Sequence, residues 1–514
     1  MTNYLLGIDG GTESIKAGIF DLEGKQIALS AVSYNTYFEH AGWAEQRIDE
    51  WESSLIKVVK DVISKSMVNP KDIIGVGADG TCCTVVFLDK NSRPVREPII
   101  WMDVRSSKEA KIIESIDMFP RRYNGSGPVS AEWFPCKNLW VKNNQPDIYK
   151  DSKIIAEYTD WLTHELTGLW ITGISTATVR GYYDNRNGGW PVSFYEEIGL
   201  KDIFEKIPEK VLRLGDYAGG ISKEFSAKTG LIEGTPVGQG AYDAASAGIG
   251  SNSHNVGQAF FIAGSGSYLQ VNIDKEFHSK GMWGSYPDII LDNYAIEGGQ
   301  TSSGSVLKWF KTNLINSKLE EEAKKENISI YKYLDLQAAK LPAGSEGVIV
   351  LEHFQGNRTP YTDPGSRGVI RGLSLKHSSI NIYRAIMESC AYGLETILRV
   401  LKDNGFEIKE IIACGGHMNS ELWTKIYSNV TGLPIKRSLN PEAAALGSAI
   451  IGGVASKAFK NLNDGADKMV KFQADVNPDP SEFKKYSIFV DNYIATYFAL
   501  KDSNDKINEF LNNQ

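Results

Sequence analysis

Tyr4-Leu-Leu-Gly-Ile-Asp9-Gly-Gly-Thr12-Glu-Ser14-Ile-Lys-Ala-Gly-Ile-Phe20 is a stretch of two apolar runs joined by a glycine-containing turn. The runs at 4–8 and 15–20 predict two neighbouring strands, and a further turn leads into a third strand that begins at Gln26. Exposed backbone N–H groups in the first turn, with the hydroxyls of Thr12 and Ser14, would suit phosphate oxygens. Asp9, at the end of the first strand, could hold Mg²⁺ directly or through water.

The known phosphate-binding motifs do not describe this turn. A P-loop would end in Gly-Lys-Ser/Thr, and a dinucleotide-binding fingerprint would continue into a helix, whereas a strand follows here. Two interpretations therefore stay open: a nucleotide-binding turn, or a plain β-hairpin that happens to contain an Asp.

The same pattern returns in the second half of the chain. Ala259-Phe-Phe-Ile-Ala263 predicts a buried strand, Gly264-Ser-Gly-Ser267 a turn, and Tyr268-Leu-Gln-Val271 a second strand. With 514 residues the chain is too long for one core, so we expect two large domains with a duplicated architecture. Two such turns facing each other across a cleft could bind one polyphosphate from both sides, although glycine turns between strands are common.

Between the two repeats lies Gly240-Ala-Tyr-Asp243-Ala-Ala-Ser-Ala-Gly248, which places one carboxylate among small residues. A substrate can approach such a carboxylate closely, and a general base needs reach before it needs a tuned pKa. The alternative is that Asp243 caps the helix that the following alanines begin.

Charged groups also follow other apolar runs. Asp79, Asp103 and Arg105 stand at the ends of such runs, and Asp103 with Arg105 could equally form a structural ion pair. The segment from Glu132 to Lys137 combines an acid, an aromatic wall and a lysine, which suits a sugar, or it is a helix start with a buried Trp133.

Near the C-terminal end, a strand at 408–414 leads into Gly415-Gly416, where a nucleobase or ribose could lie against bare backbone. The alternative is a routine strand-to-helix loop. The small-residue helix that begins near Pro441 is expected to pack behind this site.

Composition narrows the class of protein. Hydrophobic residues make up 42% and charged residues 23%, as in ordinary globular proteins, and the net charge of -8 gives no reason to expect nucleic acid or an anionic membrane as a partner. Five scattered cysteines without a CxxC pair argue against disulfides and structural zinc. No signal peptide and no membrane helix are expected, so the predicted location is the cytoplasm.

Taken together, the motifs at 6–16, 239–243, 264–267, 356–360 and 415–423 resemble the FGGY carbohydrate kinase family along nearly the whole chain. The resemblance implies an α/β fold of two ribonuclease H-like (actin/hexokinase-type) domains with the active site in the cleft between them. Residues 1–250 would bind sugar and supply the phosphate and metal hairpin and the catalytic base. Residues 251–514 would bind ATP and end in C-terminal helices. Homodimers are common in this family.

The resemblance also implies roles for individual residues. Asp243 would deprotonate the attacking sugar hydroxyl, and Asp9 would help to position Mg²⁺. The implied sugar-binding residues are Asp79, Gly80, Thr81, Asp103, Glu132, Trp133, Lys137 and Asp243. The implied ATP-binding residues are Gly11, Thr12, Glu13, Ser14, Lys16, Gly264, Ser265, Gly266, Gln300, Gly415, Gly416 and Asn419. The chain departs from the family at Lys16, where Arg is usual, and at His417-Met-Asn419, where Gly-Ala-Arg or Gly-Ala-Lys is common.

The expected substrate is a pentulose similar to ribulose or xylulose. Glycerol kinases carry Arg-Glu at the position of Thr81-Cys82 and xylulose kinases a Met-His pair near it, and neither pair is present. The blocks at 130–134 and 297–301 are more similar to ribulokinase-type members, which favours a ribulose-like sugar over a polyol such as ribitol, erythritol or glycerol. A non-catalytic sugar- or nucleotide-binding regulator would be expected to lack Asp9 or Asp243, and both are present. An actin- or chaperone-like ATPase is disfavoured by the sugar-like group at 132–137.

Overall fold

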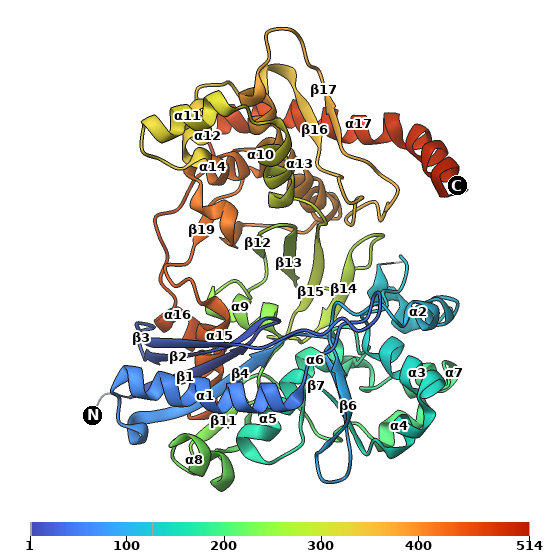
Figure 1. Ribbon diagram of the computed structural model, residues 1–514, viewed down its shortest axis with the longest axis vertical. Coiled ribbons are helices and arrows are strands. Elements are labelled where there is room, and N and C mark those ends of the chain that lie inside the picture. Colours follow the sequence, from blue (N-terminus) through green and yellow to red (C-terminus); the bar gives the residue numbers. More distant parts are fainter. Residues whose placement is uncertain (1–2, 126, 513–514) are drawn as a thin grey trace.

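Two six-stranded sheets form the centres of the two halves of the molecule (Figure 1). The computed structural model describes residues 3–125 and 127–512, so the extreme ends of the two predicted domains, 1–2 and 513–514, lie outside the described residues. The first sheet has the order β10-β11-β4-β1-β2-β3 and the second β14-β15-β13-β12-β18-β19. The strands of the first are β1 (Tyr4–Gly10), β2 (Ser14–Asp21), β3 (Gln26–Ser33), β4 (Ile73–Gly80), β10 (Tyr217–Gly220) and β11 (Pro236–Gly238). Those of the second are β12 (Gln258–Ala263), β13 (Ser267–Ile273), β14 (Trp283–Pro287), β15 (Tyr294–Gln300), β18 (Glu410–Cys414) and β19 (Ile435–Arg437).

The two sheets share the arrangement of five strands and differ in the sixth, which is β10 next to β11 in the first and β14 next to β15 in the second. In the first, β1 pairs antiparallel with β2, β2 antiparallel with β3, and β1 parallel with β4. In the second, β12 pairs antiparallel with β13, β13 antiparallel with β15, and β12 parallel with β18. The predicted duplication of strand, glycine turn and strand is therefore confirmed, and both strands of each repeat lie inside their sheet, away from its edges.

Successive side chains of β1 point to opposite faces of the first sheet, as the period of a strand requires. Leu6 packs into the core formed with α1 (Ile48–Ser66) and α5 (Tyr158–Thr167), whereas Leu5 packs into the core on the other face. Both side chains are completely buried, because helices cover both faces of the sheet.

The helix on that other face comes from the far end of the sequence. After β19 the chain returns to the first sheet as α15 (Ala443–Ala455) and α16 (Leu462–Met469), which lie in the lower part of Figure 1. A Cβ atom on Gly7 would clash with the carbonyl oxygen of Ala445, and one on Gly77 with that of Ser448, so the glycines of β1 and β4 let this small-residue helix touch the sheet. The expectation that the helix packs behind Gly415 is wrong, and residues 443–469 pack with the first domain.

The remaining elements complete the two domains. The first also contains β5 (Val85–Leu88), β6 (Pro94–Ile99), β7 (Ile154–Glu157), β8 (Thr172–Gly173), β9 (Val211–Leu212), α2 (Ser107–Glu114), α3 (Phe134–Asn144), α4 (Pro146–Asp151), α6 (Ile174–Thr178), α7 (Val192–Glu197), α8 (Lys223–Thr229) and α9 (Asp243–Gly250). The second contains α10 (Gly304–Leu314), α11 (Ser317–Lys325), α12 (Ile330–Ala338), β16 (Ile349–Leu351), β17 (Val369–Arg371), α13 (Ser379–Asp403), α14 (Glu421–Thr431) and α17 (Pro480–Asn512). Helix α13 runs through the core of the second domain and is buried along most of its length.

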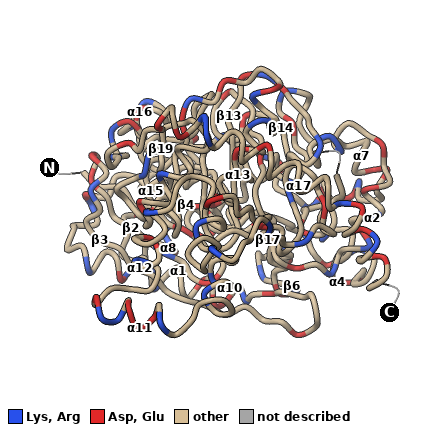
Figure 2. Tube along the Cα trace, turned by 90° about the horizontal axis from the view of Figure 1, so that it is seen from above, with Lys and Arg blue, Asp and Glu red and all other residues tan. Residues whose placement is uncertain are grey.

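Charged residues of both signs are interspersed around the molecule (Figure 2). Among the described residues, no helix is both long enough and apolar enough to cross a membrane.

Candidate active site

Asp243 faces a cavity of about 250 Å³ where the two domains meet. It is the first residue of α9, after Tyr242 in extended conformation, and its Oδ1 accepts the N–H of Ala244 at 2.7 Å. Burial, with a smaller contribution from Asp9, raises the pKa of Asp243 to about 6, although the Ala244 N–H and Arg180 act against this. The cavity is lined by Thr12, Thr81, Cys82, Cys83, Trp101, Glu132, Arg180, Tyr242, Asp243, Ala244, Tyr268, Glu297 and Arg358.

Arg180 is the central cation of this cavity, and it connects the domains. Its Nη2 donates to Glu297 Oε2 at 3.1 Å, and its Nε lies 3.5 Å from Glu132 Oε1. Glu297 Oε1 in turn accepts the hydroxyl of Tyr268 at 2.8 Å. Burial disfavours the charge of Arg180, but the two carboxylates outweigh it and raise its pKa. The arrangement presents donors and acceptors to a small polyhydroxylated molecule.

Asp9 and Asp79 lie side by side at the ends of the parallel strands β1 and β4. Asp79 is fully buried, and its Oδ2 accepts the hydroxyl of Ser448 on α15 at 2.6 Å. Burial and the neighbouring Asp9 raise the pKa of Asp79 well above its usual value, and burial also raises that of Asp9 despite nearby Lys16. Asp79 thus lies next to Asp9 in the sheet and does not line the cavity.

The other sugar-binding candidates separate into two groups. Thr81 and Glu132 line the cavity with Asp243, and Gly80 ends the strand beneath them. Asp103 is bound to Arg105 Nη2 at 2.7 Å, which is the structural ion pair that the sequence left open.

Trp133 and Lys137 lie behind the cavity instead of lining it. Trp133 is fully buried, 4.8 Å between ring centroids from Tyr182. Lys137 is also fully buried and donates to the carbonyl oxygens of Cys83 and, at 2.8 Å, Ile100. Because α3 begins at Phe134, the residues that follow Trp133 turn into the domain core.

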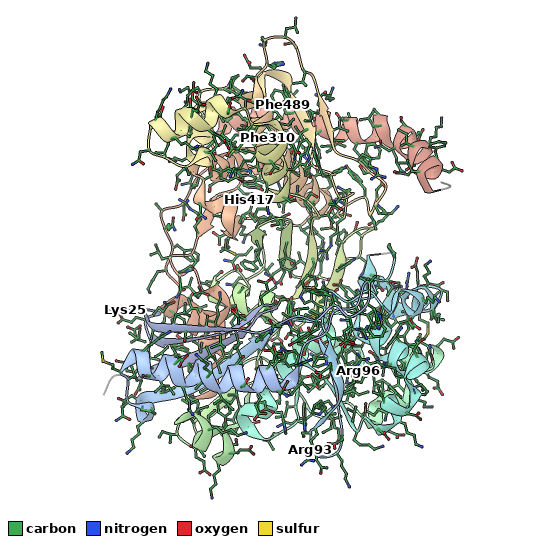
Figure 3. All side chains as sticks on the ribbon, in the orientation of Figure 1. Lys25, Arg93, Arg96, Phe310, His417 and Phe489 are labelled. Atoms are coloured by element: carbon green, nitrogen blue, oxygen red, sulfur yellow. The ribbon has the colours of Figure 1, made fainter. Side chains whose placement is uncertain are left out.

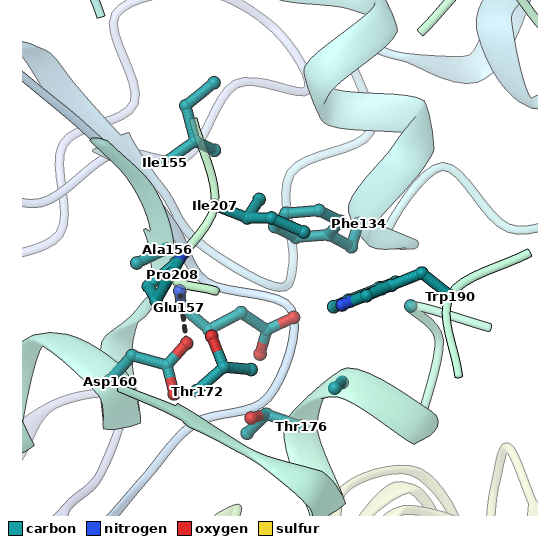
Figure 4. A pocket seen from close by; sticks show the side chains of 12 residues that line it. Phe134, Ile155, Ala156, Glu157, Asp160, Thr172, Thr176, Trp190, Ile207 and Pro208 are labelled. Carbon is teal, nitrogen blue, oxygen red and sulfur yellow. Dashed lines mark hydrogen bonds between the residues drawn. The ribbon is translucent and has the colours of Figure 1, made fainter. Parts of the chain in front are cut away.

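Lys137 and Glu157 together hold the backbone of Cys83, which adopts a left-handed conformation with φ of 61°. Glu157 Oε2 accepts the Cys83 N–H at 3.0 Å, and Lys137 Nζ donates to the carbonyl oxygen of Cys83. Figure 4 shows Glu157 beside Asp160, Thr172 and Thr176 at a cavity of about 20 Å³, enough for one water molecule. Burial raises the pKa of Glu157 well above its usual value, although the Cys83 N–H and Lys137 act against this.

Replacing Lys137 with Met should therefore loosen the turn that forms one wall of the cavity. Two buried carbonyls lose their donor, which we expect to destabilise the first domain by about 2 kcal/mol, a fall of roughly 4–8 °C in Tm. Differential scanning calorimetry measures the effect. The matched control is Lys142→Met on the same helix, where Lys142 forms a partly exposed pair with Asp202 and a change under about 1 kcal/mol is expected. Equal Tm values for the two variants would contradict the role of Lys137.

A second cavity, of about 690 Å³, lies beside the glycine turn of the second domain. Its lining includes the predicted residues Gly264, Ser265, Gly416 and Asn419, and it continues over Gly304, Leu307, Ser329, Tyr331, Lys332, Asp335, Tyr383, His417, Ser420 and Trp423. Gly415 has a φ of 97°, and a Cβ there would clash with the backbone of Ala263.

The aromatic wall of this second cavity is a stack of His417 on Trp423, with ring centroids 3.6 Å apart. His417 Nδ1 lies 3.1 Å from the Tyr427 hydroxyl, and burial lowers the pKa of His417 to about 3, so the ring is neutral. Figure 3 shows His417 in the upper domain, on its side nearer to the lower domain. A flat neutral wall of this kind suits an aromatic base.

Both predicted glycine turns are present, between β1 and β2 and between β12 and β13. Three of the side chains predicted to bind ATP, those of Thr12, Lys16 and Gln300, have partners within the protein. Gly11 N–H donates to Ser14 O at 3.0 Å, and Thr12 Oγ1 accepts the indole N–H of Trp101 at 2.9 Å. Glu13 is exposed and Lys16 Nζ lies 2.7 Å from Glu442. In the second domain, Gln300 is buried and donates to Glu352 at 2.7 Å, and Gly266 packs against the Gln300 backbone.

Sequence reasoning gave no role to Arg180, Glu297, Tyr268 or Trp101. Glu297 and Arg358 lie in motifs that carried the resemblance, which could have identified them. Arg180 follows α6 in a stretch without any recognisable motif. Its backbone is in the left-handed conformation, with φ of 65°, and its side chain lines the cavity.

Comparison with known proteins covers nearly the whole chain. The N-terminal domain of the FGGY family of carbohydrate kinases matches residues 4–250, and the C-terminal domain of that family matches residues 259–456. A ribulokinase of Geobacillus thermodenitrificans is 29% identical over 96% of this chain and 94% of its own length. A xylulose kinase of Bacillus subtilis is 26% identical over 99% of this chain and all of its own length.

Among solved structures, a xylulose kinase from Rhodospirillum rubrum superposes with a TM-score of 0.87 at 22% identity, covering 98% of this chain and all of that chain. This likeness confirms the predicted α/β fold of two actin/hexokinase-type domains. The two family domains together account for most of the sequence, and the chain belongs to the FGGY family of carbohydrate kinases.

Proposed function

We propose that the protein transfers the γ-phosphate of ATP to a hydroxyl of a pentulose similar to ribulose or xylulose. The observation that carries this proposal is Asp243: a carboxylate with a pKa of about 6, in a polar cavity between the domains, beside the Thr12 turn. The curated relatives named ribulokinase and xylulose kinase support a pentulose over a polyol.

Asp243 acts as the general base in this reaction. Its ionised carboxylate accepts the proton of the sugar hydroxyl as that oxygen attacks the γ-phosphorus in line. The new O–P bond forms while the bond to the β-phosphate oxygen breaks, ADP leaves, and the proton ends on Asp243. Closure of the domains around the cavity would exclude water, which would otherwise accept the phosphate.

The sugar would be held by groups from both domains. Arg180 donates, Glu132 and Glu297 accept, and the hydroxyl of Tyr268 does either, so several sugar hydroxyls find partners around Asp243. A polar set of this kind discriminates against substrates that lack a hydroxyl, since a buried charged partner would then remain unpaired.

The phosphates would lie between the turns at Gly11–Ser14 and Gly264–Gly266, whose backbone N–H groups suit anions. Adenosine would occupy the 690 Å³ cavity, against His417 and Trp423. Lys16 now pairs with Glu442, and we infer that it can turn from this carboxylate to the phosphates, because about a third of its side chain is exposed.

Mg²⁺ would be held by Asp9, supported by Asp79. Carboxylate oxygens are the ligands that Mg²⁺ prefers, and one Oδ of the buried Asp79 has no hydrogen-bond partner among the described residues. Those residues contain no cluster of three or more Asp, Glu, His or Cys side chains arranged for a metal ion. This agrees with the usual Mg²⁺ site of one or two carboxylates completed by phosphates and water. The ion would neutralise charge on the transferring phosphate.

A cytoplasmic location is part of this proposal. All five cysteines are free thiols in the structure, which supports a reducing compartment, and ATP is available there.

The test is ADP release by the purified protein with ATP and Mg²⁺ against pentuloses, polyols, glycerol and hexuloses. We expect one strong response among the pentuloses, with kcat/KM above about 10⁴ M⁻¹s⁻¹. If a polyol were the best substrate, the proposed phosphoryl transfer would stand, but the proposed pentulose substrate would be wrong. If no compound caused ADP release while ATP still bound, the result would favour a non-catalytic sugar- or nucleotide-binding regulator.

Binding of adenosine in the 690 Å³ cavity can be tested by substitutions of Gly416, where an added Cβ meets nothing within 4 Å. Gly416→Ala and Gly416→Leu should fold normally and fill the cavity in two steps. For the Leu variant we expect KM for ATP to rise about tenfold, a loss of about 1.4 kcal/mol, while KM for the sugar and Tm stay unchanged. An unchanged KM for ATP in the Leu variant would mean that adenosine binds elsewhere.

A further inference from the structure

Cys82 and Cys83 place two thiols side by side in the wall of the 250 Å³ cavity around Asp243, which we call the sugar cavity after the proposed function. Their Sγ atoms are 3.5 Å apart, and both residues line the cavity together with Thr81 and Asp243. Cys82 is partly exposed and Cys83 is buried. The phosphoryl transfer proposed above uses neither sulfur.

The local backbone explains why neighbouring thiols face each other. Side chains of adjacent residues point to opposite sides of a regular strand, but β4 ends at Gly80, before the pair. Cys83 is held in the left-handed conformation by Glu157 at its N–H and Lys137 at its carbonyl. The backbone of Cys83 is therefore fixed by buried groups, and its sulfur lies in contact with that of Cys82. A ligand that bridges the two sulfurs finds them already close together.

We propose that Cys82 and Cys83 form a dithiol site for trivalent arsenic compounds, and that its occupation closes the sugar cavity. Soft thiolate ligands select soft, polarisable centres. With an organic arsenic(III) oxide, two As–S bonds form, the As–O bonds break, and the two thiol protons leave with that oxygen as one water. Arsenic stays trivalent throughout, so the reaction needs no oxidant or reductant.

The pairing of the thiols gives the site its selectivity. Once the first As–S bond has formed, the second sulfur is held at a high effective concentration, so a chelate is far more stable than an adduct of one thiol. Contact with Cys83, together with burial, raises the pKa of the Cys82 thiol well above its usual value. Cys82 is thus protonated near neutral pH and a poor target for alkylating agents, which require thiolate.

Part of this inference rests on the proposed function and part does not. Formation of the adduct needs only the two sulfurs, whereas protection by sugar and loss of turnover need the cavity to be the sugar site. The two parts can therefore fail separately.

The first experiment uses the reduced full-length protein and phenylarsine oxide. Intact mass spectrometry should show one bridged adduct per chain, and peptide mapping should place it on the peptide that contains Cys82 and Cys83. The adduct should be removed by 2,3-dimercaptopropanol and should survive an equal concentration of 2-mercaptoethanol. Mapping to any other cysteine, or removal by the monothiol, would overturn the dithiol site.

Variants and ligands then test its position. Cys83→Ser should weaken adduct formation at least about 100-fold, whereas Cys414→Ser, which removes another partly exposed thiol, should leave it unchanged. A saturating sugar substrate should slow the reaction at least about tenfold, and the adduct should abolish phosphorylation. Full turnover by the adduct would show that the pair does not close the sugar site. If no sugar is phosphorylated at all, intact mass spectrometry and peptide mapping still show whether the arsenical bridges Cys82 and Cys83. In that case only the proposed function fails.

Discussion

Asp243→Asn should reduce kcat by about 1000-fold while the affinity for ATP changes less than about twofold. Removal of a positioned general base costs about 10²–10⁴ in rate, and the amide keeps the shape of the carboxylate but cannot accept a proton. Steady-state ADP release measures kcat, and the shift of Tm on adding ADP measures nucleotide binding. The comparison is Glu132→Gln, another carboxylate of the same cavity, which should raise KM for the sugar more than it lowers kcat. Turnover within about tenfold of the wild type in Asp243→Asn would refute the base assignment.

The same residue should set the pH dependence of the enzyme. Because burial raises the pKa of Asp243 to about 6, kcat should fall as the pH drops below 6, where the base becomes protonated. The effect on stability has the opposite sign. A carboxyl whose folded pKa exceeds its unfolded value binds more protons in the folded state, so its contribution to stability is lost as the pH rises from about 4 to about 6. Asp243→Asn should therefore raise the free energy of unfolding at pH 7 by up to about 3 kcal/mol. Measurement of Tm against pH for the two proteins tests this, and a variant that is less stable at pH 7 would contradict it.

Arg180→Met should raise KM for the sugar by about 100-fold or more and also lower stability. It leaves the buried Glu297 and the partly exposed Glu132 without their cation, and breaking a buried ion pair from one side costs about 3–5 kcal/mol. Arg180→Lys should rescue little, because a single ammonium cannot reproduce the planar fork that lies between both carboxylates. KM, kcat and Tm are measured for each variant.

The control for Arg180 is Arg186→Met. Arg186 also pairs across the two halves of the chain, with Asp288, but neither residue lines the sugar cavity. The Arg186→Met variant should have a lower Tm than the wild type and a KM for the sugar within about threefold of the wild-type value. A double variant of Arg180→Met with Glu297→Gln should recover part of the lost stability, since it removes the unpaired carboxylate. Equal KM effects at Arg180 and Arg186 would mean that the cation only joins the domains.

The features that could be predicted from the sequence are those written in short local patterns. Strand, glycine turn and strand occur within about 20 residues, so both glycine turns and the duplicated strand-turn-strand unit could be predicted from residues 4–20 and 259–271. The candidate base Asp243 could likewise be selected from its neighbours in sequence, because it stands among the small residues of 240–248.

What could not be predicted depends on contacts between distant residues. Arg180 meets Glu297 across 117 positions, and no local pattern marks an arginine in a left-handed conformation. Lys137 fits a sugar contact as well as a backbone clamp, and only the direction in which α3 enters the core decides between them. Helix α15 is apolar on every side, so its sequence shows that it is buried but not against which sheet.

The return of α15 to the first sheet also has a consequence for how the protein is made. During synthesis, residues 1–250 leave the ribosome long before Ala443–Ala455 exist, so one face of the nascent N-terminal sheet, with Gly7 and Gly77 at its centre, has no covering helix. A fragment ending at residue 250 would keep that apolar face open to solvent and would be prone to aggregate. Supplying residues 438–470 as a separate peptide should restore its solubility, because a segment from the last sixth of the chain completes the first domain.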